Sequence, residues 1–594
     1  MRILDSLRFV GGSFARAKLR RGAHRMLAAT ENCQQAQQNV LYRLIALNAD
    51  SQFGREHRLG DVRTAADLRN RLPVADFEAY RPYIDKMKLG DHGALLGPNN
   101  RLLMFSLSSG TTAESKYIPI TEQFLADYRR GWQSWGILAF DHHYSVHWKN
   151  IVQLTSDYDR YRTPGGTPCG NISGLVVAMQ RKVVRLMYSV PKAVAKITDP
   201  EAKYYASLRL AVADNNVGMM TTANPSTLLH LARMADREKE ELIRDIANGT
   251  LSRRFDIPPE VRAKLRFGIS IKRKKRAHFL DRIVEKTGHL WPKDYWPGME
   301  ILAVWSGGSA GAYLPSVQEL YGNVPVRDHG LHASEGRMTI PLEANTPAGV
   351  LEADTHFFEF IPEAEYGTDN PIVLEAHELE EGCNYFILMT TSSGLYRYDI
   401  QDVVRCVGFR HTAPILKFLH KGAHISNITG EKISESQVVD AVRHCAQESN
   451  THLGDFTVAP VWGEPPGYKL LVESPTAENL AHRVDAKLQE INCEYREKRQ
   501  TGRLAEMTSV DLPQGTWERF ARQRIQRNGG SIEQYKHPCL VPDMDFVARV
   551  LSESVESNTA GTSHSLQAHF GSGQHGDAKS KARSERRNRQ RIAD

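Results

Sequence analysis

The 594-residue sequence has no long apolar run. A membrane-spanning helix needs about 18 or more consecutive apolar residues. The most apolar stretch, residues 301–315, is short and interrupted by glycines. Residues 1–26 are basic but lack the apolar segment and small-residue cleavage site of a signal peptide. We therefore expect no membrane span, and we interpret the beginning of the chain as a basic amphipathic helix.

Cysteines are few and scattered, and no two form a C-x-x-C pair. An odd total without paired spacing argues against a disulfide framework and against a zinc site. This cysteine pattern fits reduced thiols, and it predicts that the protein is cytoplasmic. The seven cysteines are Cys33, Cys169, Cys383, Cys406, Cys445, Cys493 and Cys539.

Charge of one sign is not in large excess. The net charge is +7, and residues 555–594 hold seven Lys/Arg against four Asp/Glu, so the rest of the chain is nearly balanced. One basic cluster, residues 272–276 (KRKKR), could be a nuclear-localisation or nucleic-acid patch. No aromatic residues interleave it as base stacking would require. We interpret it as a solvated helix face and expect no nucleic-acid partner.

The apolar periodicity predicts an α/β protein. Residues 35–48 have helical spacing, residues 101–107 read as a strand, and helices alternate with short strands between 123 and 232. A strand followed by a glycine loop lies at 301–311. Residues 349–409 are rich in strands, which predicts an antiparallel sheet or barrel appended to the α/β part. Beyond residue 422 two helices and two strands predict a small α+β domain, with residues 478–499 as one long helix.

These patterns predict three parts of the chain. Residues 1–423 form a large α/β domain with an appended β-barrel-like subdomain, and residues 424–552 form a small, mobile α+β domain. Residues 553–594 are rich in Ser, Gly, His, Arg and Lys, with too few large apolar residues to build a core. We expect this basic tail to be disordered.

A hydroxyl-rich loop follows the strand at 101–107. Small residues, free backbone N–H groups and a cation are what a phosphate cradle requires. The loop is not a Walker A motif, because G-x-x-x-x-G-K-[ST] is absent. Taken alone, an ordinary Ser/Thr-rich turn explains it equally well. Its candidate phosphate-binding residues are Ser108, Ser109, Gly110, Thr111, Thr112 and Lys116.

Four further motifs follow in order along the chain. They are Ser306-Gly307-Gly308, His332-Ala333-Ser334-Glu335-Gly336, the run from Tyr396 to Asp402, and Gln534-Tyr535-Lys536. This succession resembles the adenylate-forming superfamily. More closely, it resembles the Gretchen Hagen family of acyl-acid amido synthetases, known from auxin-responsive plant proteins and from bacterial relatives. The resemblance runs from about Gln38 to Val547.

The resemblance implies a role for each motif. The first loop would grip the phosphates of ATP, and Gly307 and Gly308 would let the backbone approach the nucleotide. Ser334 would contact phosphate, and Glu335 would act in catalysis by holding Mg²⁺. Asp402 would accept hydrogen bonds from both ribose hydroxyls. Lys536 would be the catalytic lysine that offsets charge as a carboxylate attacks the α-phosphate.

The sequence also departs from the family pattern. Ala113 and Glu114 stand where a second glycine is expected in the phosphate loop, and Gln401 replaces the glycine before Asp402. Leu331 or His332 takes the place of an aromatic residue. In the hinge motif Lys421 stands where arginine is usual, which keeps the charge but loses the planar fork.

The implied activity is ATP-dependent ligation through an acyl-adenylate. The partners would be a small carboxylic acid and an amine, usually an amino acid, with ATP and Mg²⁺ as cofactors. Two alternatives stay open. The acyl group could pass to coenzyme A or a carrier thiol, or the chain could bind nucleotide without catalysis. We expect the acyl pocket near residues 219–224 and the helices between 123 and 140, while the identity of the acid, the amine and the oligomeric state do not follow from the sequence.

Overall fold

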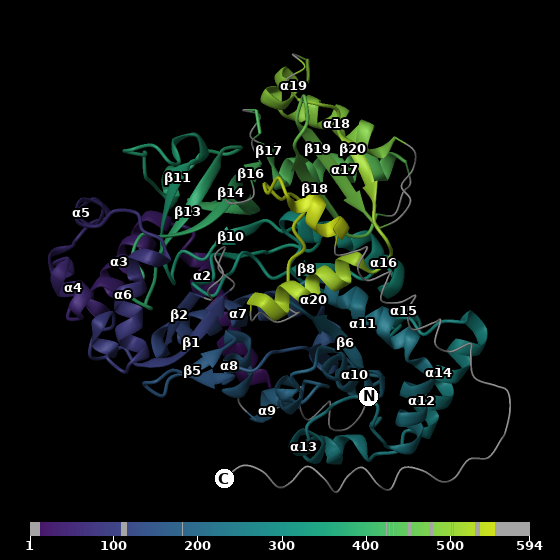
Figure 1. Cartoon of the computed structure of the whole chain (residues 1–594). Helices are drawn as coiled ribbons and strands as arrows, with labels where there is room; N and C mark the ends of the chain where they lie inside the picture. Colours follow the sequence, from purple (N-terminus) through teal and green to yellow (C-terminus); the bar gives the residue numbers. More distant parts are fainter. Residues whose placement is uncertain are drawn as a thin grey trace, which may run out of the picture.

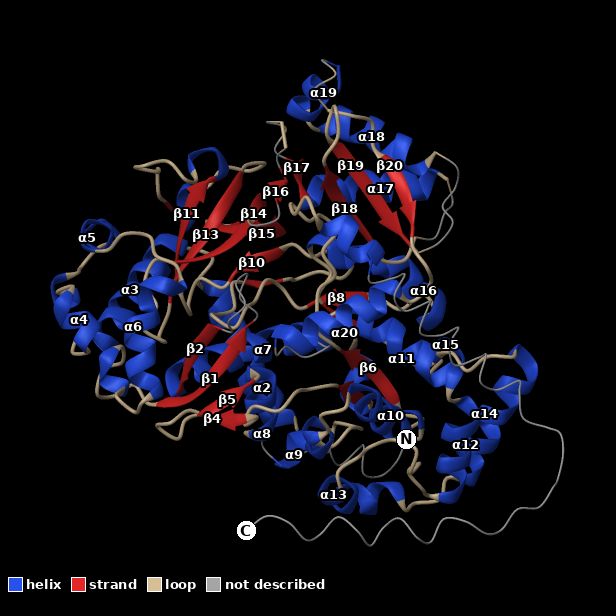
Figure 2. Cartoon of the chain, in the orientation of Figure 1, coloured by secondary structure: helices blue, strands red, loops and turns tan. Residues whose placement is uncertain are grey.

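The computed structural model describes residues 12–108, 116–180, 182–422, 425–426, 428–429, 431, 433–449, 453–473, 479–500, 502, 504–528 and 535–552. The candidate residues Ser109, Gly110, Thr111 and Thr112 and the tail predicted to be disordered lie outside these ranges. Figure 1 shows the arrangement of the elements, and Figure 2 distinguishes helices from strands.

The first half of the chain is mainly helical. Its helices are α2 (Ser13–Ala28), α3 (Cys33–Asn48), α4 (Gln52–Glu56), α5 (Ala65–Arg71), α6 (Phe77–Lys88), α7 (Glu122–His142), α8 (Ile172–Ala178), α9 (Lys182–Arg185), α10 (Pro200–Val212), α11 (Pro225–Arg237), α12 (Lys239–Asn248), α13 (Pro259–Ile269), α14 (Lys274–Thr287) and α15 (Pro292–Tyr295). The later helices are α16 (Leu314–Tyr321), α17 (Glu435–Glu448), α18 (Leu480–Ile491), α19 (Cys493–Gln500) and α20 (Thr516–Asn528).

A parallel sheet lies at the centre of the α/β part. Its strands are β3 (Asn150–Gln153), β6 (Val217–Thr221), β7 (Ile301–Val304) and β8 (Val326–Asp328), in that order, and every neighbouring pair is parallel. Buried residues of α10, α11, α12, α14 and α16 share one apolar core with these strands. The alternation of helices and strands read from the sequence is therefore confirmed.

Two more sheets share a second core. β2 (Lys116–Thr121), β1 (Leu102–Ser108), β5 (Pro168–Gly170) and β4 (Tyr161–Arg162) form a mixed sheet in that order. The other sheet is antiparallel, as expected from the strand-rich segment 349–409. In order, its strands are β12 (Leu374–Glu375), β11 (Phe357–Pro362), β13 (Asn384–Thr390), β14 (Tyr398–Arg410), β15 (Ala413–Lys421), β10 (Gly349–Leu351) and β9 (Thr339–Ile340).

The described residues between 425 and 552 pack around cores of their own. β18 (Phe456–Val461), β19 (Gly467–Val472) and β20 (Thr508–Asp511) form one sheet, and β16 (Ile425–Ser426) pairs with β17 (Ile433–Ser434). Helices α17 and α18 pack against β18 and β19 in a core made of residues 433–540. In Figure 1 this part, drawn in green and yellow, lies above the parallel sheet, and α20 extends toward α11.

The prediction of one long helix over residues 478–499 is wrong. The structure has two helices, α18 and α19, separated by Asn492, whose backbone is extended (φ −129°, ψ 108°). The Asn492 side chain donates to the Glu431 carbonyl (3.2 Å) and to Gln437 Oε1 (3.0 Å). Asparagine often trades helical backbone bonds for side-chain bonds of this kind, so a tertiary contact ends the helix where the apolar pattern continues.

Helix α7 contains two glycines with different surroundings. A Cβ at Gly131 would lie 2.6 Å from Arg337 Cδ and 2.6 Å from Glu352 Oε2, whereas a Cβ at Gly136 would have no heavy atom within 4 Å. In the interior of a helix, alanine is more favourable than glycine by up to about 1 kcal/mol. We expect Gly136→Ala to raise the melting temperature slightly.

Gly131→Ala should instead lower the free energy of unfolding by about 1 to 3 kcal/mol, because overpacking displaces the buried Arg337–Glu352 pair. Denaturant unfolding of both variants checks this. Equal stabilisation by the two substitutions would mean that the core beside Gly131 has room to spare.

Candidate active site

A cavity of about 260 Å³ opens at the carboxyl ends of the parallel strands. The segments that follow β3, β6, β7 and β8 all contribute to its lining, and open α/β sheets bind ligands at this edge. We call it the strand-end cavity. Its lining residues are Tyr128, Trp132, residues 153–156, residues 171–173, residues 221–224, Trp305, His329, residues 332–334 and Lys536. The expected pocket segments, around 219–224 and within 123–140, both contribute.

Uncharged aromatic and imidazole rings form much of the wall. Trp132 lies with its ring centre 5.0 Å from that of His329 and 5.5 Å from that of His332. Burial lowers the pKa of His332 to about 4, and it lowers the pKa of His329 well below the usual value. His329 Nε2 lies 3.2 Å from Thr221 Oγ1. Both imidazoles are therefore neutral at pH 7, and this part of the cavity suits an apolar or planar group.

Lys536 brings a cation into the strand-end cavity from the C-terminal part of the chain. Its Nζ lies 4.8 Å from the ring centre of Trp305 and 5.8 Å from that of Phe418. Protein atoms around the side chain lower its pKa, and Asp402 opposes this shift, although the residue stays accessible from the cavity. Asn224 donates a 2.8 Å hydrogen bond to the Tyr535 carbonyl, which fixes the backbone beside the lysine.

The glycine turn after β7 is shaped by two features. Gly308 has φ +57°, which favours glycine, and a Cβ there would lie 3.0 Å from Phe418 Cε1 and 3.1 Å from the Leu419 carbonyl. The Asp328 carboxylate stabilises the turn by accepting 2.5 Å hydrogen bonds from the backbone N–H and the hydroxyl of Ser306. Burial raises the pKa of Asp328 to about 6. Gly308 therefore lets the turn after β7 pack closely against Phe418 and Leu419 of β15.

Ser334 and Glu335 follow β8 in a short turn. The Ser106 hydroxyl of β1 donates to the Ser334 hydroxyl at 3.2 Å, which places this turn beside the strand that leads into the hydroxyl-rich loop. Glu335 is only 8% exposed. Burial raises the pKa of Glu335, while Lys421 and Lys116 oppose the rise. A buried carboxylate flanked by cations is not the surface charge that a glutamate in a turn usually is.

Mg²⁺ prefers one or two carboxylates together with phosphate oxygens and water. Within the described part of the chain, the only group of three or more metal-binding side chains close enough to share an ion is Glu201, His230 and Glu518, in another region. Glu335 therefore fits Mg²⁺ as a single protein carboxylate alongside phosphate, and does not fit a site built from protein ligands alone.

Asp402 and Lys421 form an ion pair across β14 and β15. Lys421 Nζ donates to Asp402 Oδ1 at 2.5 Å and to the Ile400 carbonyl at 3.0 Å. Burial works against the charge on Lys421, but the contact with Asp402 outweighs it and raises the lysine pKa. Asp402 is 4% exposed. The residue before it, Gln401, has φ +59°, the left-handed region that favours glycine. This left-handed backbone conformation explains why a glycine is expected at position 401.

Ser108 and Lys116 are paired in register at the end of the β1–β2 hairpin where the chain passes from one strand to the other. The residues between them lie outside the described ranges. Lys116 Nζ lies 5.9 Å from the ring centre of Phe77, and its charge influences Glu335. The structure thus brings Lys116, Asp402 and Lys421 within electrostatic reach of Glu335. Ser334 and Lys536 share the strand-end cavity, and Gly308 packs against Phe418 beneath Lys536.

Sequence reasoning missed several residues of this site. It singled out neither the segments 153–156 and 171–173 nor Asp328 or His329, and it covered Trp132 only as part of the expected pocket range 123–140. A signal was present for two of them, because Asp328 ends a strand and His329 directly follows it, at the edge where ligand contacts gather in parallel sheets. The segments 153–156 and 171–173 carry ordinary polar residues, and only the folded chain brings them to the cavity.

Family models match three successive parts of the chain. The GH3 family N-terminal domain matches residues 22–326, the central domain residues 349–421 and the C-terminal domain residues 436–545. The chain belongs to the GH3 family. The resemblance read from the ordered motifs is therefore confirmed.

Curated relatives cover most of this GH3 protein. An indole-3-acetic acid-amido synthetase (GH3.4) of Arabidopsis thaliana is 23% identical over 565 residues, which cover 88% of this chain and 92% of the relative. A jasmonoyl–L-amino acid synthetase (JAR6) of Nicotiana attenuata is 22% identical over 89% of this chain and 94% of its own. The structure of the GH3.15 acyl acid amido synthetase aligns with a TM-score of 0.79 at 20% identity, over 90% of this chain and 96% of that one. The similarity confirms the α/β fold.

No helix within the described ranges of this GH3 protein combines the length and the apolarity needed to cross a membrane.

Proposed function

We propose that this GH3 protein is an ATP-dependent ligase that adenylates a carboxylic acid and transfers the acyl group to an amine, which we take to be an amino acid. One observation carries the proposal. In a chain that matches the GH3 family along its length, Lys536 from the C-terminal part lines the same cavity as Ser334 from the turn after β8. A cation held at a ligand cavity suits a reaction in which two anions must approach each other.

In this proposal the acid lies in the strand-end cavity with its carboxylate toward Lys536. One carboxylate oxygen attacks the α-phosphorus of ATP, the bond to the bridging oxygen breaks, and pyrophosphate leaves. Lys536 and Lys116 offset the negative charge of the reacting groups. Ser334 and the loop from Ser108 to Thr112 contact phosphate, and Asp402 accepts hydrogen bonds from the ribose. Mg²⁺ held by Glu335 would neutralise phosphate charge.

The amine then attacks the acyl carbonyl, forms the amide and releases AMP. Water must be kept from the mixed anhydride until then. The neutral rings of Trp132, His329 and His332 would provide the apolar surroundings that favour aminolysis over hydrolysis.

The proposal also includes a division of the chain into domains, one of which moves during the reaction cycle. Residues 424–552 would form a small domain that turns about Lys421 and Gly422 after adenylation and withdraws Lys536, since hinged closures often control such cycles. The antiparallel sheet from β9 to β15 would curl as a barrel-like subdomain. A cytoplasmic location remains a prediction from the sequence.

Pyrophosphate exchange tests the first half-reaction. With a panel of aryl, indolyl and fatty carboxylates, and without amine or thiol, we expect labelled pyrophosphate to enter ATP with at least one acid. Exchange must vanish when the acid is omitted. A protein that binds ATP but exchanges with no acid would support the alternative of a nucleotide-binding member without catalysis.

A further inference from the structure

Helices α13 and α14 meet at a strongly basic surface, which we call the basic corner. It is formed by residues 261–280, which contain eight Lys/Arg and no Asp/Glu. Five of these cations are exposed: Lys264, Arg266, Lys272, Lys274 and Lys275. Within the described part of the chain, none of the five pairs with a carboxylate. Helices favour acidic side chains in their first turn, yet α14 begins with two lysines and has no acid there. Helix formation therefore does not account for this concentration of charge.

Two large apolar side chains are exposed at the basic corner. Phe267 is 88% exposed and Ile271 is 48% exposed. Among the residues that the structure describes, no large apolar side chain is more exposed than Phe267. The inner face of α13 packs through Val261, Leu265 and Ile269, so Phe267 lies on the opposite face of the helix. Single exposed apolar residues are common, but here two of them lie among five exposed cations.

The basic corner also borders a hollow of about 850 Å³. The five consecutive basic residues 272–276 line it, and none of the described residues that line it is acidic. Arg276 is fixed in the wall by hydrogen bonds to the Val212 carbonyl (2.9 Å) and the Tyr295 carbonyl (2.8 Å). The hollow leaves room for bulky anionic groups beside these cations.

We propose that the basic corner binds the surface of an anionic membrane. The basic side chains would lie against the negatively charged head groups, where each is worth roughly a five-fold factor in binding. Phe267 and Ile271 would enter the boundary between the head groups and the acyl chains, as the apolar residues of surface-bound helices do. This attachment is to one face of the bilayer and needs no membrane-spanning helix.

A nucleic acid is a poorer partner for the basic corner. Ile271 offers no ring on which a base could stack. The ring of Phe279, which lines the hollow, is covered by the Arg276 guanidinium, 5.1 Å from the ring centre. Contacts to phosphate alone would leave Phe267 and Ile271 in water, whereas a membrane takes up both.

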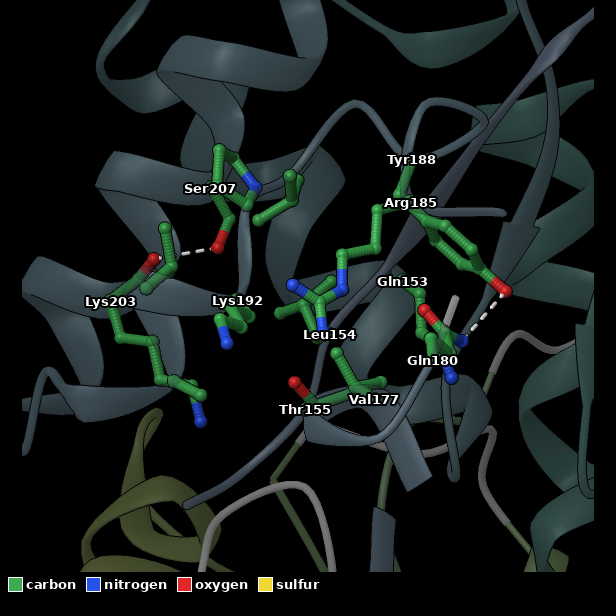
Figure 3. A pocket seen from close by; sticks show the side chains of 14 residues that line it. Gln153, Leu154, Thr155, Val177, Gln180, Arg185, Tyr188, Lys192, Lys203 and Ser207 are labelled. Carbon is green, nitrogen blue, oxygen red and sulfur yellow. Dashed lines mark hydrogen bonds between the residues drawn. The ribbon is translucent and has the colours of Figure 1, made fainter. Parts of the chain in front are cut away.

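The basic corner lies close to the cavities of the α/β part. Figure 3 shows a second cavity, of about 200 Å³, which shares residues 153–155 with the strand-end cavity. Val194, in the 3₁₀ helix η4 (Lys192–Lys196), lines this second cavity and packs in one apolar cluster with Val261 and Leu265 of α13. Helix α13 therefore lies behind one wall of the second cavity. In Figure 1 α13 and the C-terminal helices α17 to α19 lie at opposite edges of the molecule, so a membrane at the basic corner would leave the small domain free to move.

Flotation of the full-length protein with lipid vesicles tests the proposal. We expect binding to vesicles of phosphatidylserine and phosphatidylcholine at low salt, and binding at least about 10-fold weaker to phosphatidylcholine alone or at high salt. The triple variant Lys272→Gln/Lys274→Gln/Lys275→Gln should weaken binding to the anionic vesicles about 100-fold. Phe267→Gln should weaken it about 10- to 100-fold, because an aromatic ring no longer enters the lipid.

Matched controls change exposed residues elsewhere. The triple variant Lys86→Gln/Lys417→Gln/Arg496→Gln removes the same charge from α6, β15 and α19, and Trp462→Gln removes an aromatic ring that is 74% exposed. Both should bind the anionic vesicles within a few-fold of wild type, and the melting temperatures of all variants show that the fold is kept.

The opposite results are equally definite. No binding to anionic vesicles, equal binding to neutral ones, or an equal loss in the control triple variant would overturn the proposal. A short single-stranded RNA that binds through the same three lysines, together with vesicle binding that Phe267→Gln leaves unchanged, would show a site for polyanions and would also overturn it. Losses confined to the basic corner, in both the lysine variant and Phe267→Gln, support it.

Discussion

Lys536→Ala is expected to slow adenylation by about 10²- to 10³-fold, since a single electrostatic contact to a developing charge is commonly worth that factor. The ammonium lies 4.8 Å from the Trp305 ring at the strand-end cavity, and nothing else described there carries a full positive charge. Aminolysis of a supplied acyl-adenylate should be far less affected, because in the proposed cycle Lys536 has left the site by then. Pyrophosphate exchange and single-turnover amide formation measure the two steps.

Two comparisons sharpen this test. Lys417→Ala, at an exposed position next to Phe418 on β15, removes a charge outside the cavity and should leave both rates near wild type. Asp402→Ala should weaken the use of ATP and of the adenylate alike, seen as a raised KM in each half-reaction. Equal slowing of both steps by Lys536→Ala would contradict the proposed movement of the small domain.

Arg337→Met should destabilise the fold by about 3 to 5 kcal/mol, because it leaves a buried carboxylate without its counter-ion. Arg337 and Glu352 are each 1% exposed, with 3.7 Å between Arg337 Nε and Glu352 Oε2. The guanidinium also lies 4.6 Å from the Trp132 ring centre, directly behind the wall of the strand-end cavity. Urea unfolding with an unchanged m-value measures the loss of stability.

The pH dependence of this variant has a definite sign. Burial raises the pKa of Glu352 well above its usual value, and Arg337 is the largest influence lowering it. Without Arg337 the pKa of Glu352 in the folded state would rise further, so the folded variant would keep this proton to a higher pH than the wild type does, while the unfolded chain releases it. Stability should therefore fall as the pH rises above the unfolded glutamate value of about 4.3. The double variant Arg337→Met/Glu352→Leu should recover much of the stability and lose this slope. A single variant as stable as wild type at neutral pH would show that the pair is not held as an ion pair.

Local patterns predicted most of the elements. Helix α3 begins and ends within a few residues of its predicted range, and the strands at 301–304 and 349–409 are where the apolar alternation places them. The break at Asn492 was not predictable from periodicity, because the bonds that end the helix go to Glu431 and Gln437, far away in the sequence.

The residues of the candidate site also fall into two groups, those that the sequence could indicate and those that only the fold brings together. Ser334, Glu335, Asp402 and Lys536 stand in recognisable motifs, so the sequence could nominate them before any contact was known. The buried pair of Arg337 and Glu352 could not be nominated, because its partners meet only when β9 pairs with β10.

The central claim is that the acyl group passes from an adenylate to an amine. The most direct measurement incubates the protein with ATP, Mg²⁺, the acid that supports exchange, a mixture of amino acids and coenzyme A, and identifies the products by mass. We predict an N-acyl amino acid formed in equal amount with AMP, and no product when ATP is omitted. A coenzyme A thioester as the ATP-dependent product, with no amide, would contradict the account.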